Sequence, residues 1–223
     1  MPDQTTDRRD NVAEQPAFLQ DAEFIELHGK KPAVARWTTD PSVRFDAEEA
    51  EQRLREGRNV GVALGPNDLV VDVDPRHGGD ESWLRLTADL AIDGSAFPTV
   101  RTGSGGLHVY MRLPDDARRM KNDLGRDGYP GVELKCIGRQ VVAPGSTHPD
   151  TGKPYTVLYG LDPLMDDLGL PEVPRRSWSS AGDRRWPRTV RHPATTRQTG
   201  WRALWSTSIQ RSTAAGTRSG WNF

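Results

Sequence analysis

Apolar and polar positions alternate in short runs along most of the chain, a pattern typical of β-strands. Strand candidates lie at residues 24–27, 60–64, 69–74, 99–101, 107–113, 132–136, 139–143 and 155–158. Helical spacing appears after Asp46, a predicted N-cap, and again at residues 81–90. The turn at residues 65–68 predicts that the strands on either side of it form a hairpin. The fold class is therefore predicted to be α+β, with a largely antiparallel sheet.

Composition divides the chain into three regions. We expect residues 1–20 to be a flexible N-terminal arm, residues 21–174 to be the folded body, and residues 175–223 to be a disordered tail. The tail holds ten Arg and five of the seven Trp but few aliphatic residues, so it cannot bury enough surface to offset its ordering entropy. The alternative is that the tail grips single strands by phosphate contacts and base stacking.

The net charge of −1 hides an asymmetry, because the tail carries +9 and residues 1–174 carry −10. An acidic body argues against general nucleic-acid binding through charge alone, since phosphate neutralisation supplies most non-specific affinity. It is compatible with a metal-dependent enzyme, in which clustered carboxylates hold cations.

Other bulk features exclude several classes of protein. Cys136 is the only cysteine, which rules out an internal disulfide and a multi-cysteine zinc site. No apolar run approaches the roughly 18 residues of a membrane span, and the first residues lack the pattern of a signal peptide. We therefore expect a cytoplasmic protein with no membrane partner.

Asp72 and Asp74 are the sharpest chemical signal. They end an apolar strand candidate, and the period of two places both carboxylates on one face while Val71 and Val73 point to the other. With Cα atoms about 6.5 Å apart, their repulsion at an effective dielectric of about 20 is roughly 2.5 kcal/mol. Bound Mg²⁺ or Mn²⁺ would relieve it. The alternative is a pair of solvated acids at a strand end.

Two further features could complete a site. The loop Thr102-Gly103-Ser104-Gly105-Gly106 has few side chains, so its backbone N–H groups could approach phosphate, and it leads into the strand that carries His108. It lacks the Gly-Lys-Ser/Thr ending of a P-loop. Glu133 lies between apolar neighbours on a strand candidate, where burying an unpaired carboxylate would be costly and a metal shared with the aspartates would offset that cost. The alternative is an exposed acid on an edge strand.

Together these segments resemble the N-terminal domain of the bifunctional DNA primase/polymerase family, in the archaeo-eukaryotic primase superfamily. The likeness runs from about residue 24 to about residue 160, in order and at similar spacing. The matching segments are Lys30-Lys31-Pro32, residues 59–63, residues 71–75, residues 101–108, residues 131–133 and residues 141–146, with Trp37 and Tyr155.

The resemblance implies a primase-polymerase fold: an N-terminal α/β unit, an RRM-like antiparallel sheet unit, and an active site in the cleft between them. Residues 21–174 would then be the catalytic domain. The metal-binding acids would be Asp72, Asp74 and Glu133, with His108 on the phosphates of the nucleotide. The resemblance places Ser104, Gly105, Gly106 and His108 at the nucleotide. The nucleotide-binding set is completed by three candidate cations for the triphosphate or the template: Lys31, Arg101 and Arg139.

The implied activity is template-dependent nucleotidyl transfer by two-metal catalysis with Mg²⁺ or Mn²⁺. No zinc is expected, because Cys136 stands alone. The implied partners are single-stranded DNA, nucleoside triphosphates and a separate replicative helicase, in the replication of a phage, plasmid or integrated element. The third acid is Glu where many members are expected to have Asp.

Two other functions remain open at this point. One is a noncatalytic nucleic-acid or nucleotide-binding module that keeps the fold but not the chemistry. The other is a metal-dependent hydrolase of the Toprim or nuclease type, which also uses an Asp-x-Asp pair at a strand end. In that class the essential glutamate precedes the aspartates, whereas Glu133 follows them.

Overall fold

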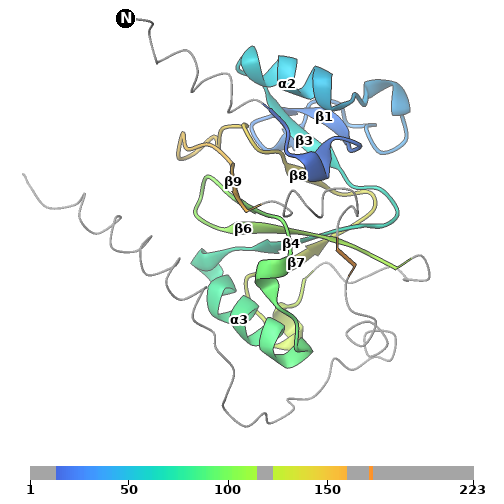
Figure 1. The fold of residues 1–223 in the computed structure, drawn as a ribbon. Coiled ribbons are helices and arrows are strands. Elements are labelled where there is room, and N and C mark those ends of the chain that lie inside the picture. Colours follow the sequence, from blue (N-terminus) through green and yellow to red (C-terminus); the bar gives the residue numbers. More distant parts are fainter. Residues whose placement is uncertain (1–13, 115–122, 160–170, 173–223) are drawn as a thin grey trace, which may run out of the picture. The chain divides into compact units, whose positions relative to one another are not determined.

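The computed structural model describes residues 14–114, 123–159 and 171–172 (Figure 1). The two α-helices of these residues are α2 (Ala47–Arg55) and α3 (Gly79–Leu90). The strands are β1 (Glu23–His28), β2 (Lys31–Pro32), β3 (Asn59–Ala63), β4 (Asp68–Val73), β5 (Thr99–Arg101), β6 (Leu107–Arg112), β7 (Val132–Lys135), β8 (Gln140–Val142) and β9 (Thr156–Tyr159). Short 3₁₀ helices are η1 (Ala17–Leu19), η2 (Pro41–Val43), η3 (Pro75–His77), η4 (Gly94–Ala96) and η5 (Gly125–Asp127). The α+β class predicted from the sequence is confirmed.

The strands form two antiparallel sheets. The four-stranded sheet has the order β2-β1-β3-β8, and the five-stranded sheet has the order β7-β4-β6-β5-β9. The predicted hairpin of β3 with β4 is therefore wrong, because these strands belong to different sheets. The turn between them is closed by the Asp68 carboxylate, which accepts from the Gly65 N–H at 2.7 Å. An alternating pattern identifies a strand but does not determine which strand it pairs with. The turn residues between β3 and β4 therefore did not indicate a hairpin.

Each helix packs against one sheet. Helix α2 contacts β1 and β3, and α3 contacts β4 and β7 (Figure 1). The predicted N-cap of α2 is confirmed, since the Asp46 carboxylate accepts from the Glu49 N–H at 3.0 Å. Helix α3 begins two residues before the predicted start and buries Trp83 and Leu86.

The hydrophobic core joins the two sheets. One buried cluster contains Phe24 and Val62 of the four-stranded sheet together with Val70 and Tyr110 of the five-stranded sheet. Because side chains alternate along a strand, Asp72 lies on the same face of β4 as Val70. The fold therefore directs Asp72 toward the four-stranded sheet.

Residues 14–20, which the sequence assigned to a flexible arm, pack against the body. Leu19 is buried, the Phe18 ring packs against Tyr110 at a tilt of 57° with centroids 5.1 Å apart, and the side chain of Gln15 donates to the Pro144 carbonyl at 3.2 Å. The rest of that arm and the tail at 175–223 lie outside the described residues. Neither described helix is long and apolar enough to cross a membrane.

Candidate active site

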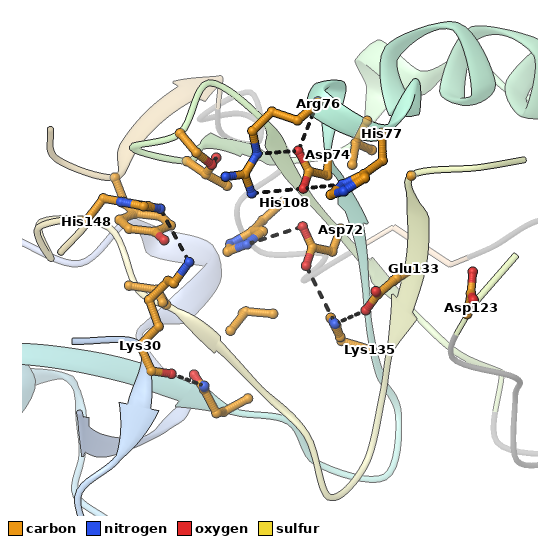
Figure 2. Close-up of a pocket in the computed structure, with 18 of the residues that line it drawn as sticks. Lys30, Asp72, Asp74, Arg76, His77, His108, Asp123, Glu133, Lys135 and His148 are labelled. Atoms are coloured by element: carbon orange, nitrogen blue, oxygen red, sulfur yellow. Dashed lines mark hydrogen bonds and ion pairs between the residues drawn. The ribbon is translucent and has the colours of Figure 1, made fainter. Parts of the chain in front are cut away.

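Three of the predicted site residues lie side by side on adjacent strands. Asp72 of β4 is directly opposite His108 of β6 and directly opposite Glu133 of β7. Directly opposite residues in antiparallel strands project from the same face. The two acids and the histidine, from three separate stretches of sequence, therefore share one face of the five-stranded sheet (Figure 2).

The second acid, Asp74, is fixed by its own backbone. Its N–H donates to the Gly131 carbonyl at 2.8 Å, and its carbonyl accepts from the Gly79 N–H at 2.9 Å. A Cβ on Gly79 would lie 2.5 Å from the Gly131 oxygen, so only glycine allows this approach. The start of α3 and the segment before β7 therefore hold Asp74 beside the end of β4.

A pocket of about 600 Å³ opens over this face. Five predicted residues line it: Asp72, Asp74, Glu133, His108 and Ser104. The other five predicted nucleotide-binding residues are not part of its lining: Gly105, Gly106, Lys31, Arg101 and Arg139. The pocket is also lined by Val141 and Val142 at β8, so both sheets contribute to its walls.

The glycine-rich loop is more ordered than its composition suggested. The Gly105 N–H donates to the Thr102 carbonyl at 2.9 Å, and the Gly106 N–H donates to the Thr102 hydroxyl at 2.9 Å. These two amides are therefore already bonded within the loop and do not face a ligand. The Ser104 hydroxyl, 3.0 Å from that of Thr102, is the part of the loop that lines the pocket.

Each acid has a cation beside it. The Lys135 ammonium lies 3.6 Å from an Asp72 oxygen and also pairs with the Glu133 carboxylate (Figure 2). Asp74 accepts from the Arg76 guanidinium at 2.9 and 3.0 Å, and the Arg76 hydrogen bonds lower the pKa of Asp74 to about 2. The carboxylate repulsion inferred from the sequence is thus offset by neighbouring positive charges.

His108 is the buried member of the site. Its side chain is 7% exposed, and its Nε2 lies 3.8 Å from an Asp72 oxygen. Burial lowers its pKa, against the opposing effect of the Asp72 charge. At neutral pH the imidazole is therefore uncharged, and a neutral ring can donate one N–H and accept at the other nitrogen.

Glu133 lies in a different environment from the one expected. Its side chain is 49% exposed, because β7 is an edge strand of the five-stranded sheet. The cost of burial used to argue for a metal therefore does not apply to it. Its position opposite Asp72 and its contact with Lys135 are what connect it to the site.

Sequence reasoning assigned no role to several residues that line the pocket: Lys30, Arg76, His77, Lys135 and His148. One signal could have found Lys135, because the period of two puts it on the face of Glu133. Arg76 directly follows the Asp-x-Asp-Pro motif. His148 gave no local signal, since it lies in a loop between β8 and β9.

The carboxylate oxygens of the pocket are the type of ligand that binds a hard divalent cation. Carboxylate oxygens are the ligands that Mg²⁺ and Mn²⁺ prefer, and Asp72 and Glu133 already converge on one cation, the Lys135 ammonium. Among the described residues, no three His, Cys, Asp or Glu side chains are grouped as they stand to hold a metal. A metal would therefore fit the Asp72 and Glu133 pair once Lys135 has moved away.

A comparison with known families identifies the family of the chain. The family model described as "Bifunctional DNA primase/polymerase, N-terminal" matches residues 19–176. No curated protein matches the chain. The family is one of nucleotidyltransferases that act on DNA and nucleotides, and the match takes in every residue of the pocket described above. Because it also covers well over half of the sequence, the chain belongs to the bifunctional DNA primase/polymerase family, through that family's N-terminal domain.

Proposed function

We propose that the chain is a template-dependent nucleotidyltransferase that extends a DNA or primer strand along a single-stranded DNA template. The observation that supports this most is the placement of His108 on β6 and Glu133 on β7, each directly opposite Asp72 on the strand between them, β4. Two acids beside an uncharged imidazole, in a pocket of about 600 Å³, offer ligands for cations next to a donor for phosphate.

In this proposal Asp72, Asp74 and Glu133 hold two Mg²⁺ or Mn²⁺ ions. Such ions, when bound, activate a 3′-hydroxyl and neutralise charge on the triphosphate. Lys135 swings out of the position between Asp72 and Glu133, which its long flexible side chain allows.

The chain's own residues orient the nucleotide. His108 donates its one N–H to a phosphate oxygen in place of its hydrogen bond to the Val142 backbone, and burial keeps that imidazole in the uncharged form at neutral pH. The Ser104 hydroxyl approaches the same phosphates from the loop before β6. Lys31, Arg101 and Arg139, outside the pocket lining, are proposed to contact the template.

We further propose that the site lies in a cleft between an N-terminal unit built on the four-stranded sheet and an RRM-like unit built on the five-stranded sheet. Pocket residues from both sheets support this arrangement. The biological role proposed is replication of a phage, plasmid or integrated element, with single strands supplied by a separate helicase.

The test is nucleotide incorporation on a primed and an unprimed single-stranded template, with Mg²⁺ or Mn²⁺. Asp72→Asn removes a charge but keeps the shape, and we expect it to reduce incorporation at least about a hundredfold. The matched control is Asp21→Asn, an exposed acid outside the pocket, which should keep full activity. Thermal melting of both variants shows whether they remain folded.

Other outcomes would favour other functions. Cleavage of the template without incorporation would indicate a hydrolase. Binding of nucleotide or DNA with neither reaction would indicate a noncatalytic module. Equal incorporation by Asp72→Asn and the unaltered protein would remove Asp72 from the mechanism.

A further inference from the structure

The wall of the pocket opposite the acids carries two nitrogen donors. Lys30 lies in the turn between β1 and β2, and His148 lies in the loop between β8 and β9. The Lys30 Nζ is 3.4 Å from the His148 Nε2 (Figure 2). These residues are 118 positions apart in sequence, so only the fold brings them together.

The hydrogen bonds of His148 show which nitrogen carries its proton. The Asp150 N–H donates to His148 Nδ1 at 3.2 Å, so Nδ1 is an acceptor and the ring proton is on Nε2. The Asp150 carboxylate is 3.9 Å from Nδ1, beyond hydrogen-bonding distance. Burial and the neighbouring Lys30 charge lower the pKa of His148, which agrees with an uncharged ring.

Two donors therefore face each other. An ammonium group has three donors and no acceptor, and the Nε2–H of His148 is also a donor. In the tautomer that accepts from the Asp150 N–H at Nδ1, they do not hydrogen-bond to each other, and His148 is only 1% exposed, which limits its access to water. A buried donor without an acceptor costs about 1–3 kcal/mol. An anion with several acceptor oxygens, lying against both, would satisfy them together.

One side chain ties the two segments together. The Asn59 amide nitrogen donates to the Gly29 carbonyl at 3.0 Å and to the Thr147 carbonyl at 2.7 Å, and its oxygen accepts from the Thr147 N–H at 2.8 Å. Gly29 and Thr147 directly precede Lys30 and His148 in the sequence. Asn59 therefore sets the spacing of the donor pair.

The imidazole itself is held in place. The His148 N–H donates to the Lys153 carbonyl at 2.9 Å, and the ring stacks on Tyr155 with centroids 6.1 Å apart and planes 20° apart. The Gly103 backbone also packs closely here, because a Cβ on Gly103 would lie 2.4 Å from the His148 Cβ and 2.5 Å from the Lys153 carbonyl oxygen. The donor at Nε2 is thus prepositioned.

We propose that Lys30 and His148 form a phosphate subsite, one that binds a phosphate group of the nucleoside triphosphate or of the nucleic-acid backbone. This inference rests on the proposed function, because it supplies a ligand to the same pocket. A phosphate presents several acceptor oxygens on one small group, which matches two donors 3.4 Å apart. The subsite also faces the acids across the pocket, as a metal-bound polyphosphate requires (Figure 2).

The test is calorimetric binding to the full chain. The probes are dATP, deoxyadenosine and a short oligothymidine, and the variants are Lys30→Met, which removes the charge, and His148→Phe, which keeps a stacking ring without the N–H. His148→Gln keeps a donor close to the Nε2 position. Arg55→Met is the matched control, because it removes one positive charge from an exposed side chain on α2, outside the pocket lining.

We expect Lys30→Met and His148→Phe each to weaken phosphate binding about tenfold. The double variant should lose little more than one single variant, because both donors serve one phosphate. His148→Gln should lose less affinity than His148→Phe. Arg55→Met should bind dATP and oligothymidine as the unaltered protein does, and deoxyadenosine, which has no phosphate, should bind equally to all variants. A loss confined to dATP assigns the subsite to the triphosphate, and a loss confined to oligothymidine assigns it to the backbone.

Unchanged binding of both dATP and oligothymidine by folded Lys30→Met and His148→Phe would overturn the subsite and leave the proposed function standing. Failure of the unaltered protein to bind dATP or oligothymidine at all would instead reject the proposed function. Melting curves of the variants separate loss of the donor from loss of the fold.

Discussion

Replacing Lys135 should have opposite effects on two properties of the pocket: the stability of the metal-free protein and its affinity for a divalent cation. Its ammonium lies 3.6 Å from Asp72 and pairs with Glu133, so it occupies the position in which these carboxylates would share a divalent cation. Lys135→Met keeps the length of the side chain and removes the charge. We expect the metal-free protein to become less stable and the affinity for Mg²⁺ or Mn²⁺ to rise.

The geometry sets the size of both effects. At 3.6 Å and an effective dielectric of about 20, the gross attraction between Asp72 and Lys135 is roughly 4.6 kcal/mol. The three side chains are 22 to 49% exposed, so solvent screening and side-chain entropy leave a net contribution of about 1 kcal/mol. Without Lys135, the like charges of Asp72 and Glu133 face each other across β4 and β7, which adds up to about 1 kcal/mol.

The expected loss is therefore about 1–2 kcal/mol, or roughly 2–8 °C in melting temperature for a chain of this size. A divalent cation no longer has to displace the ammonium, so its affinity should rise about tenfold. The measurement is thermal melting across a titration of MgCl₂ or MnCl₂ at constant ionic strength, with Arg55→Met, an exposed cation on α2, as the control. If Lys135→Met responded to metal as the unaltered protein does, the divalent cation would not bind between Asp72 and Glu133.

Two further predictions concern the contacts that hold Asp74 and His148 in place. Because the pKa of Asp74 is lowered to about 2 in the folded protein, its pairing with Arg76 stabilises the fold above about pH 4, and this contribution disappears as the pH falls toward 2. Asp74→Asn should therefore lower the melting temperature by about 2 °C at pH 7 and by less at pH 3, and an equal loss at both pH values would contradict the pairing. Gly103→Ala should reduce stability by about 1–3 kcal/mol in urea unfolding and weaken dATP binding, since its methyl group would displace His148; unchanged binding would show that this loop does not position the imidazole.

Periodicity alone predicted the strand that carries Asp72. It did not place Asp74, which lies after the end of β4 and caps η3, where the period of two no longer applies. The run from Leu69 to Val73 has a period of two, so its strand and the face of Asp72 followed from local sequence. The same argument put Val71 and Val73 on the opposite face, and both are buried. The α2 cap at Asp46 was equally local, because capping depends on residues three positions apart.

The choice of strand partners did not follow from local sequence. Strands β3 and β4 are separated by four turn residues, yet β3 pairs with β1 and β8 while β4 pairs with β6 and β7. Pairing depends on which faces the whole fold buries, and a turn-like sequence between two strands is compatible with a hairpin or a crossing between sheets.

The cationic residues that line the pocket also could not be predicted from the sequence. The sequence analysis names Lys31, and not its neighbour Lys30, as a nucleotide-binding residue. In the structure Lys31 lies on β2 outside the pocket lining, whereas Lys30 lies in the turn before β2 and lines the pocket. A shift of one position in a turn redirects a side chain, and no periodic pattern fixes that direction. The role inferred for His148 depends on its contact with Lys30, which is 118 positions away in the sequence.

The two walls of the pocket differ in how their charges are balanced. On the acidic wall, Asp74 and Glu133 each pair with a cation two residues further along the chain, Arg76 and Lys135. Lys30 and His148, on the opposite wall, have no acid between them, and the Asp150 carboxylate lies beyond hydrogen-bonding distance of the ring.

A ligand that satisfies both walls must bring positive charge to the acids and acceptor oxygens to the facing donors. A metal-bound triphosphate has both parts in one molecule, joined over a short distance. A free divalent cation would leave the Lys30 and His148 donors unsatisfied, and a free phosphate would have to approach uncompensated carboxylates once Lys135 moved. Binding of dATP and of Mg²⁺ should therefore be mutually strengthening, and equal dATP affinity with and without Mg²⁺ would show that the two walls do not serve one ligand.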